Sequence, residues 1–302
     1  MISNEIGHCP LCGNHYYQPT RNGLLRCRTC TVVLNRQVWD KGANAAHEEE
    51  WFDNKYVLET FWTGLFQSWN NRRTWWKLNG RLPARARLLE IGVGTGSLLR
   101  FLRDRNIEVE GCDLSRSVCE RIKDVDGIPM YNCPVAQIPH SAPYDVVVMH
   151  HVLEHVNEPV QFLKDVRTLL GRAGIVIIRV PNVFCCEAHL PGWNSYEPYH
   201  LVYFSPATLR RAVEQAGFEV LRIGTHESFS GWFLALLRTL LRTNQKTAGE
   251  RFAQREAAHL SWVGHAYRLA MVLSGVITLP LRFLQGAIGR GDEVVLIARK
   301  VE

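Results

Sequence analysis

The sequence lacks an apolar segment after Met1 and has no uninterrupted run of about twenty apolar residues, so we expect neither export nor a membrane-spanning helix. It also lacks a strong charge excess. Its 35 Lys and Arg against 29 Asp and Glu leave a net charge of +6, which is too small to favour a nucleic-acid partner. With 302 residues of ordinary composition, the chain is long enough for one large globular domain and a small one.

Nine cysteines are an odd number for a disulfide framework, and we expect a reducing, cytoplasmic location. Four of them form two C-x-x-C pairs with fourteen residues between the pairs: Cys9, Cys12, Cys27 and Cys30. Four thiolates at this spacing suit tetrahedral zinc, and an all-cysteine set is typical of a structural site. We predict a zinc ribbon over residues 1–36 that folds around its metal. The alternatives are free cysteines or a redox pair, although a redox pair needs only one C-x-x-C motif.

A connector over residues 37–84 is rich in aromatic side chains that recur mostly at helical intervals. They are Trp51, Phe52, Tyr56, Phe61, Trp62, Phe66, Trp69, Trp75 and Trp76. We expect helices across the mouth of a ligand site, with most rings packed in the core. Stacking of one or two rings on a substrate is the alternative.

The central motif is the stretch Leu88–Leu99, in which an apolar run meets a glycine-rich turn and an amphipathic run follows. This pattern predicts a buried parallel strand, a tight loop and a helix start, where glycines let the backbone approach a ligand. A second strand is expected at Ile107–Cys112, and Asp113 closes it about twenty residues after the glycines. A carboxylate at that place can bind both ribose hydroxyls of a nucleotide. The alternative is a helix N-cap, for which Ser115 competes.

Strand and helix patterns alternate over residues 85–225, which predicts an α/β fold with a doubly wound, mostly parallel sheet. Further strands are expected near Met130–Pro134, Tyr144–His150, Gly174–Asn182, Phe218–Gly224 and Glu293–Lys300.

The spacing E-x-G-x-G-x-G from Glu90 to Gly96 resembles that of class I S-adenosylmethionine-dependent methyltransferases. The segments Tyr144–Val156, Pro198–Leu209 and Ala216–Val220 are similar to the ubiquinone-biosynthesis-like, methyltransferase type 23 branch. The resemblance spans about residues 85–230 and resumes at 292–300. It implies a Rossmann-like sheet of seven strands whose last strand is antiparallel, in a methyltransferase domain over residues 85–302.

The resemblance also implies S-adenosylmethionine as the cosubstrate. The glycines would lie at its methionine end, Glu90 would organise that loop or serve the structure alone, and Asp113 would bind the ribose. Many relatives carry an acid or polar residue where this chain has Asn132, Cys133 and Pro134, so the adenine contacts depart from the family pattern. The cofactor-binding candidates are Glu90, Gly92, Gly94, Gly96, Asp113, Leu114, Asn132, Cys133 and His150.

Two histidines are catalytic candidates. In the resembling branch, residues matching His151, Glu154 and His155 are associated with a divalent metal, and positions i, i+3 and i+4 share one helix face. Such a metal would orient a diol and lower the pKa of a hydroxyl; the alternative is that Glu154 and His155 only bind neighbouring loops. His200, in the long loop Pro181–Ser205, is the expected general base, or else a structural hinge residue.

An apolar insertion over residues 226–291 interrupts the pattern before the last strand. It contains the apolar segments Gly231–Leu241 and Ala266–Ile288, the second broken by Pro280. Residues 231–290 carry eight Lys and Arg but only two Asp and Glu, a net charge of +6. We expect amphipathic helices in peripheral contact with the inner face of the membrane, or else a helical cap or dimer interface.

These patterns together predict a methyltransferase that methylates an oxygen of a small-molecule, glycan or lipid-linked acceptor. Methylation of nitrogen or carbon on a nucleotide-linked sugar is one alternative. A zinc-ribbon binding protein that holds the cofactor without catalysis is the other.

Overall fold

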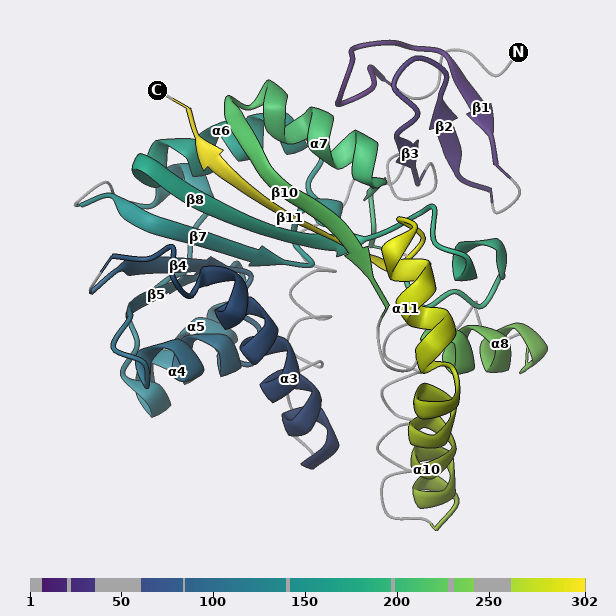
Figure 1. The fold of residues 1–302 in the computed structure, drawn as a ribbon. Helices are drawn as coiled ribbons and strands as arrows, with labels where there is room; N and C mark the ends of the chain where they lie inside the picture. Colours follow the sequence, from purple (N-terminus) through teal and green to yellow (C-terminus); the bar gives the residue numbers. More distant parts are fainter. Residues whose placement is uncertain are drawn as a thin grey trace.

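The computed structural model has an α/β fold built around one seven-stranded sheet (Figure 1). The residues that it describes are 7–20, 23–35, 61–83, 85–139, 142–196, 199–227, 231–241 and 262–301. The strands of the large sheet are β4 (Arg87–Ile91), β5 (Glu108–Cys112), β6 (Met130–Tyr131), β7 (Tyr144–His150), β8 (Leu170–Pro181), β10 (Phe218–His226) and β11 (Glu293–Lys300). They lie in the order β10-β11-β8-β7-β4-β5-β6.

Five of these strands, from β8 to β6 in the sheet order, run parallel, while β11 runs antiparallel to both of its neighbours. This arrangement confirms the predicted doubly wound, mostly parallel sheet with an antiparallel last strand. The strand order reverses at β4, which lies between β5 and β7. In such sheets the ligand crevice lies beyond the carboxyl ends of the strands at the reversal point.

Helices cover both faces of the large sheet (Figure 1). One face carries α3 (Phe61–Leu78), α4 (Ser97–Arg103) and α5 (Arg116–Asp126), and the other carries α6 (Pro159–Leu169) and α7 (Pro206–Gln215). Each helix buries an apolar stripe against alternate residues of the strands. The stripe of α4, for example, is Leu98, Leu99 and Leu102.

A second, four-stranded sheet contains the cysteine-rich segment. Its first strands are β1 (Tyr17–Pro19), β2 (Leu25–Cys27) and β3 (Val33–Leu34), all antiparallel. The fourth strand, β9 (Val202–Tyr203), comes from the long loop after β8 and pairs antiparallel with β3. The backbone N–H of Asn35 donates to the carbonyl of Leu201 at 3.0 Å and extends this pairing. No sequence pattern predicts this connection between the ribbon and the loop.

The aromatic connector is described only over part of α3. Trp51, Phe52 and Tyr56 lie outside the described residues. Trp75 packs against the core, whereas Trp69 and Trp76 are 57% and 66% exposed and are therefore not among the core rings.

The apolar insertion forms three described helices: α8 (Gly231–Leu241), α10 (Trp262–Ile277) and α11 (Leu279–Ala287). The indole N–H of Trp232 donates to Gln285 at 2.8 Å and holds α8 to α11. The hydroxyl of Thr225 donates to the carbonyl of Gly286 at 3.0 Å and anchors α11 to β10. None of the helices in the described ranges is long and apolar enough to cross a bilayer.

Candidate functional site

The glycine-rich loop follows β4 at the carboxyl edge of the sheet. Gly92, Gly94 and Gly96 have φ angles of 72°, 61° and 78°, in the left-handed region that favours glycine. A Cβ atom at Gly92 would overlap the side chain of Val152, so a side chain has no room there. The loop therefore exposes backbone rather than side chains to whatever lies beyond the strand ends.

Asp113 follows β5 at the same edge and is only 4% exposed. Its Oδ1 accepts the N–H of Ser115 at 2.9 Å, and its Oδ2 accepts the N–H of Gly94 at 3.4 Å. The N-cap of α5 is Ser115, whose hydroxyl accepts the N–H of Val118. The helix-capping alternative for Asp113 is thus taken by Ser115, and both oxygens of Asp113 are fixed in place beside the glycine loop.

Glu90 is buried near the end of β4, and its Oε2 has no hydrogen-bond partner within the described ranges. Burial, followed by the charge of Asp113, raises the pKa of Glu90 well above its ordinary value. A carboxyl group with an unsatisfied oxygen is costly in a core, which makes it a candidate for binding a donor from a ligand.

Asn132 braces the loop that follows β5. Its side-chain amide donates to the carbonyls of Asp113 at 3.0 Å and Leu114 at 2.9 Å. The carbonyl of Cys133 accepts the thiol of Cys112 at 3.2 Å, and Leu114 is 58% exposed above the loop. Through these contacts Asn132 and Cys133 position the backbone around Asp113 and Leu114. A contact of Leu114, Asn132 or Cys133 with adenine stays a prediction.

The segment after β7 differs from the expected helix. His151 has a left-handed φ of 57°, and only a short 3-10 helix, η2 (Leu153–His155), follows it. The Nδ1 of His151 lies 3.2 Å from Oε1 of Glu154, but its Nε2 lies 3.0 Å from Glu293. Because His151 is left-handed and only a 3-10 turn follows, the expected helix face of His151, Glu154 and His155 does not form, and both ring nitrogens of His151 contact carboxylates.

The structure instead brings His200 to Glu154 and His155. One ligand atom from each of these three side chains, hereafter the Glu154 cluster, lies within 4.8 Å of the others. The Nδ1 atoms of His155 and His200 bond to the carbonyls of Tyr199 at 3.1 Å and Ser195 at 2.9 Å. Since a carbonyl only accepts, each Nδ1 is the donor and each Nε2 is unprotonated in the neutral ring.

These contacts fit a divalent metal. Ligating histidines usually donate their second ring nitrogen to a carbonyl or carboxylate, as both do here. Glu154 is 1% exposed, and its Oε2 has no hydrogen-bond partner among the described residues. Two imidazoles and one carboxylate form a familiar set of ligands for divalent transition metals.

The charges around the Glu154 cluster are strongly shifted. Burial opposes the charge of His151, yet hydrogen bonds to Glu154 and Glu293 raise its pKa to about 9. Burial would raise the pKa of Glu154, but the hydrogen bond and charge of His151 lower it to about 2. Burial, then His155, lowers the pKa of His200 to about 3. His200 is therefore neutral near pH 7, and Glu154 is ionised.

Sequence reasoning missed three groups beside this cluster: Arg179 at the end of β8, His226 at the end of β10 and Glu293 at the start of β11. Glu293 lies 2.7 Å from Nε2 of His226 and 3.7 Å from Nε of Arg179. A lone cation within the apolar strand GIVIIRVPN was the available signal for Arg179. His226 and Glu293 gave none, because only antiparallel pairing of β10 with β11 makes them neighbours.

The expected base, His200, is held by both sheets. It lies two residues before β9, and the N–H of Leu201 donates to the carbonyl of Glu154 at 2.8 Å. The side chains of Val33 and Tyr203 pack with Trp193 of the same loop. The ribbon sheet thus fixes the segment that carries His200 against the segment that carries Glu154.

The four ribbon cysteines meet at one point. The Sγ atoms of Cys9 and Cys30 are 3.4 Å apart, those of Cys12 and Cys27 are 3.5 Å apart, and all four lie within 4.8 Å. Tetrahedral zinc with thiolate bonds of about 2.3 Å needs sulfur separations of roughly 3.8 Å. The arrangement fits a structural zinc ion.

Comparison with known proteins gives a consistent family. A family model described as a methyltransferase domain matches residues 70–223. A probable S-adenosylmethionine-dependent methyltransferase of Mycolicibacterium smegmatis is 27% identical over 136 residues, 44% of this chain and 52% of that protein. The chain thus matches about half the length of this relative. The same fold occurs in the crystal structure of a protein assigned as a sarcosine dimethylglycine methyltransferase from Galdieria sulphuraria, with a TM-score of 0.50. The two sequences are 16% identical, and the match covers 78% of this chain and 84% of that chain.

Removing zinc should loosen the loop of His200. We expect Cys27→Ser to lower the zinc content and to speed hydrogen exchange in residues 201–204, because β9 loses its ordered partner β3. Hydrogen-exchange mass spectrometry would measure this, with peptides from β4 and β7 unchanged. Cys186→Ser, outside the cluster, is the matched control. Unchanged exchange at 201–204 in zinc-free protein would contradict the coupling.

Replacing Asp113 should weaken cofactor binding. We expect Asp113→Asn to lower the affinity for S-adenosylhomocysteine by tenfold or more, since about 1.5–3 kcal/mol is typical of a hydrogen bond to a charged group. Isothermal titration calorimetry would measure this, with Asp124→Asn, on the exposed side of α5, as the control. Equal affinities of the two variants would remove Asp113 from the site.

Proposed function

The chain belongs to the class I S-adenosylmethionine-dependent methyltransferases, and from this premise we propose that it transfers a methyl group to an oxygen of its acceptor. S-adenosylmethionine supplies an activated methyl on sulfur, and the acceptor displaces that sulfur in line. Such a reaction needs proximity and alignment, plus a way to activate a hydroxyl. The observation that carries the choice of oxygen is the Glu154 cluster.

The cofactor half of the site would be formed by the glycine loop, Glu90 and Asp113. The two backbone bonds hold both oxygens of Asp113 beside the glycine loop, where they would accept from the ribose hydroxyls. The unsatisfied Oε2 of Glu90 would accept from the donor at the amino-acid end of the cofactor. His150, whose Nε2 is buried without a partner in the described residues, would border the methyl.

The acceptor half would include Glu154, His155 and His200 as metal ligands. When bound there, a divalent ion would lower the pKa of an acceptor hydroxyl and hold it in place. His151 orients Glu154 through its 3.2 Å contact, and the carbonyls of Tyr199 and Ser195 orient the two ligand rings. A lowered pKa makes His200 a weak general base but a good neutral ligand, so we place it in the ligand set.

Methylation at nitrogen or carbon would not need this metal. A non-catalytic protein would not need the buried polar atoms of the acceptor half that have no hydrogen-bond partner. Both alternatives to O-methylation therefore differ from it in their dependence on Glu154 and His200.

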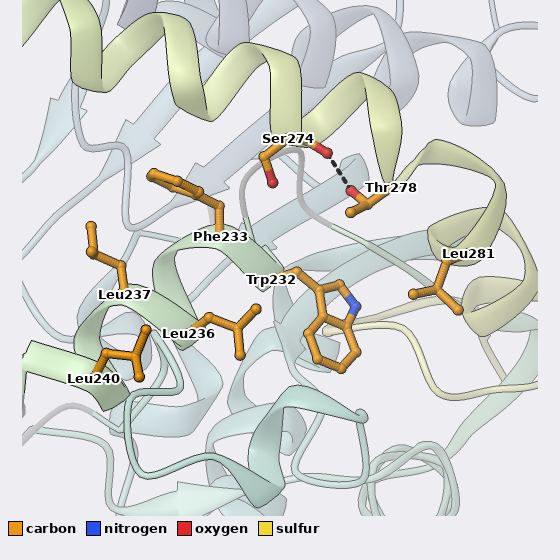
Figure 2. Close-up of a pocket in the computed structure, with 8 residues that line it drawn as sticks. All are labelled: Trp232, Phe233, Leu236, Leu237, Leu240, Ser274, Thr278 and Leu281. Atoms are coloured by element: carbon orange, nitrogen blue, oxygen red, sulfur yellow. Dashed lines mark hydrogen bonds between the residues drawn. The ribbon is translucent and has the colours of Figure 1, made fainter.

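We also propose that α8, α10 and α11 contact an anionic membrane, which would bring a lipid-linked acceptor within reach. Large apolar side chains are exposed along these helices. They are Leu236, Leu240, Leu241, Leu269, Leu273, Val276, Ile277, Leu279, Leu281, Phe283, Leu284 and Ile288, hereafter the apolar face. Between α8 and the α10–α11 pair, an apolar cavity of about 380 Å³ opens beside Trp232 and Leu281 (Figure 2). The +6 charge of residues 231–290 complements anionic headgroups.

The proposed reaction is tested with methyl-labelled S-adenosylmethionine and fractionated cell extract, with and without a chelator. We expect label on an oxygen of the acceptor. The chelator should abolish this labelling, and added Mn²⁺ or Mg²⁺ should restore it. Glu154→Gln and His200→Ala should each weaken Mn²⁺ binding, measured by electron paramagnetic resonance, at least tenfold, since each removes one ligand. Binding of S-adenosylhomocysteine should change less than twofold.

The matched control is His189→Ala, an exposed residue of the same loop. Label on nitrogen or carbon, unaffected by Glu154→Gln, would replace O-methylation with the first alternative. Tight cofactor binding without label in any fraction would favour the non-catalytic protein.

Flotation with vesicles of phosphatidylglycerol and phosphatidylcholine tests the membrane contact. We expect the full chain to float, and the double variant Leu240→Glu, Phe283→Glu to remain in the soluble fraction, because both positions are about four-fifths exposed, at 79% and 80%. Val125→Glu, 75% exposed on α5, is the control and should float. A wild-type chain that stays soluble and dimerises through these helices would overturn the proposal in favour of an interface.

A further inference from the structure

Three cationic side chains gather at the carboxyl edge of the sheet, on the side covered by α3. Arg73 and Lys77 are four residues apart on α3 and therefore share one face of the helix. Arg179 lies on the same face of β8 as Ile175 and Ile177. These two side chains pack in the same core cluster as Leu78 of α3. We call Arg73, Lys77 and Arg179 the Arg179 cluster.

Two buried nitrogens of this cluster have no hydrogen-bond partner among the described residues. The Nζ of Lys77 is enclosed and has no hydrogen-bond partner in the described part of the chain. Arg179 is 3% exposed, and its Nε likewise has no hydrogen-bond partner among these residues. Unpaired charges are costly to bury, so positions that keep them are candidates for binding an opposite charge.

The acid that pairs with Arg179 is shared with two histidines. Glu293 lies 3.7 Å from Nε of Arg179, but its two oxygens already contact His151 at 3.0 Å and His226 at 2.7 Å. Burial, followed by the charges of Arg179 and Arg73, lowers the pKa of Lys77 to about 7. Burial, followed by the charge of Arg179, also lowers the pKa of Arg73, although Glu293 and Asp292 act in the opposite direction. The charge of Arg179 thus acts against the charged forms of both cations on α3.

The cluster lies next to the proposed reaction site. In the register of the parallel strands, Arg179 pairs with His150, the last residue of β7. The next residue, His151, contacts Glu154. An anion held by Arg179 would therefore lie one strand away from the segment that carries the Glu154 cluster, where the acceptor of the proposed reaction must bind.

We propose that Arg73, Lys77 and Arg179 bind an oxyanion, a phosphate or a carboxylate, that the methyl acceptor carries. This inference rests on the proposed function, because it assigns the charge of the acceptor in that reaction. The arginines supply forked donors for two oxygens, and Lys77 supplies a point charge from the helix. The bound oxyanion offsets the repulsion among the cations, so substrate binding completes an electrostatically unsatisfied site.

The test uses the full chain loaded with S-adenosylhomocysteine, and inorganic phosphate and acetate as separate probes at constant ionic strength. We expect saturable binding of one or both by calorimetry, and a higher unfolding temperature in that anion than in chloride. Lys77→Met and Arg179→Met should each weaken binding at least tenfold and abolish the thermal shift. Lys123→Met, exposed on α5, should bind as the wild type does.

The two probes separate the chemical sources: preference for phosphate indicates a phosphorylated acceptor, and preference for acetate a carboxylic acid. Lys77→Met itself should unfold at the same or higher temperature in chloride, since it removes an unpaired buried charge. Absence of saturable binding for both anions, or equal binding by Lys77→Met and wild type, would overturn the proposal. Anion binding that persists in a protein without methyl transfer would leave this site standing while the proposed function fails.

Discussion

The parallel pairing of β4 with β5 and β7 is the constraint on which the rest of the molecule depends. Parallel strands end at one edge, and the sheet order reverses at β4, so the groups that follow these strands converge there. Glu90, Asp113 and His150 owe their proximity to this geometry. Asp113 already accepts two backbone N–H groups, whereas Glu90 and His150 each carry a buried atom with no hydrogen-bond partner among the described residues.

A second pairing, of β3 with β9, gives the small ribbon a role in that edge. The ribbon packs apolar side chains into the main core and against the loop after β8, and its four cysteines meet at one point. Through the pairing of β3 with β9, the ribbon holds the part of this loop that contains His200. The four-cysteine cluster, far from Glu154 in sequence, is thereby connected to the segment of the proposed catalytic site.

The proposed anion site and the apolar face could both bind the same acceptor. The Arg179 cluster would bind a charged group close to the reacting hydroxyl, while α8, α10 and α11 would contact the hydrocarbon of a membrane. An acceptor with an anionic head and a lipid tail would use both surfaces. A soluble anionic acceptor would use the Arg179 cluster alone, and the apolar face would then serve another partner.

The sequence by itself determined the sheet, the glycine loop, Asp113 and the four cysteines, because apolar periodicity, glycine spacing and C-x-x-C pairs are local patterns with direct physical meaning. It predicted functional roles for the segments of His200 and Glu154, and the structure brings these two side chains together. It failed for the membership of the Glu154 cluster: His151 was expected in place of His200, because a continuous helix was assumed where a left-handed residue and one 3-10 turn occur. Only the tertiary structure decided that His200, Arg179, Lys77 and Glu293 gather at one edge, since strand register and loop packing join residues up to about 220 positions apart, as from Arg73 to Glu293.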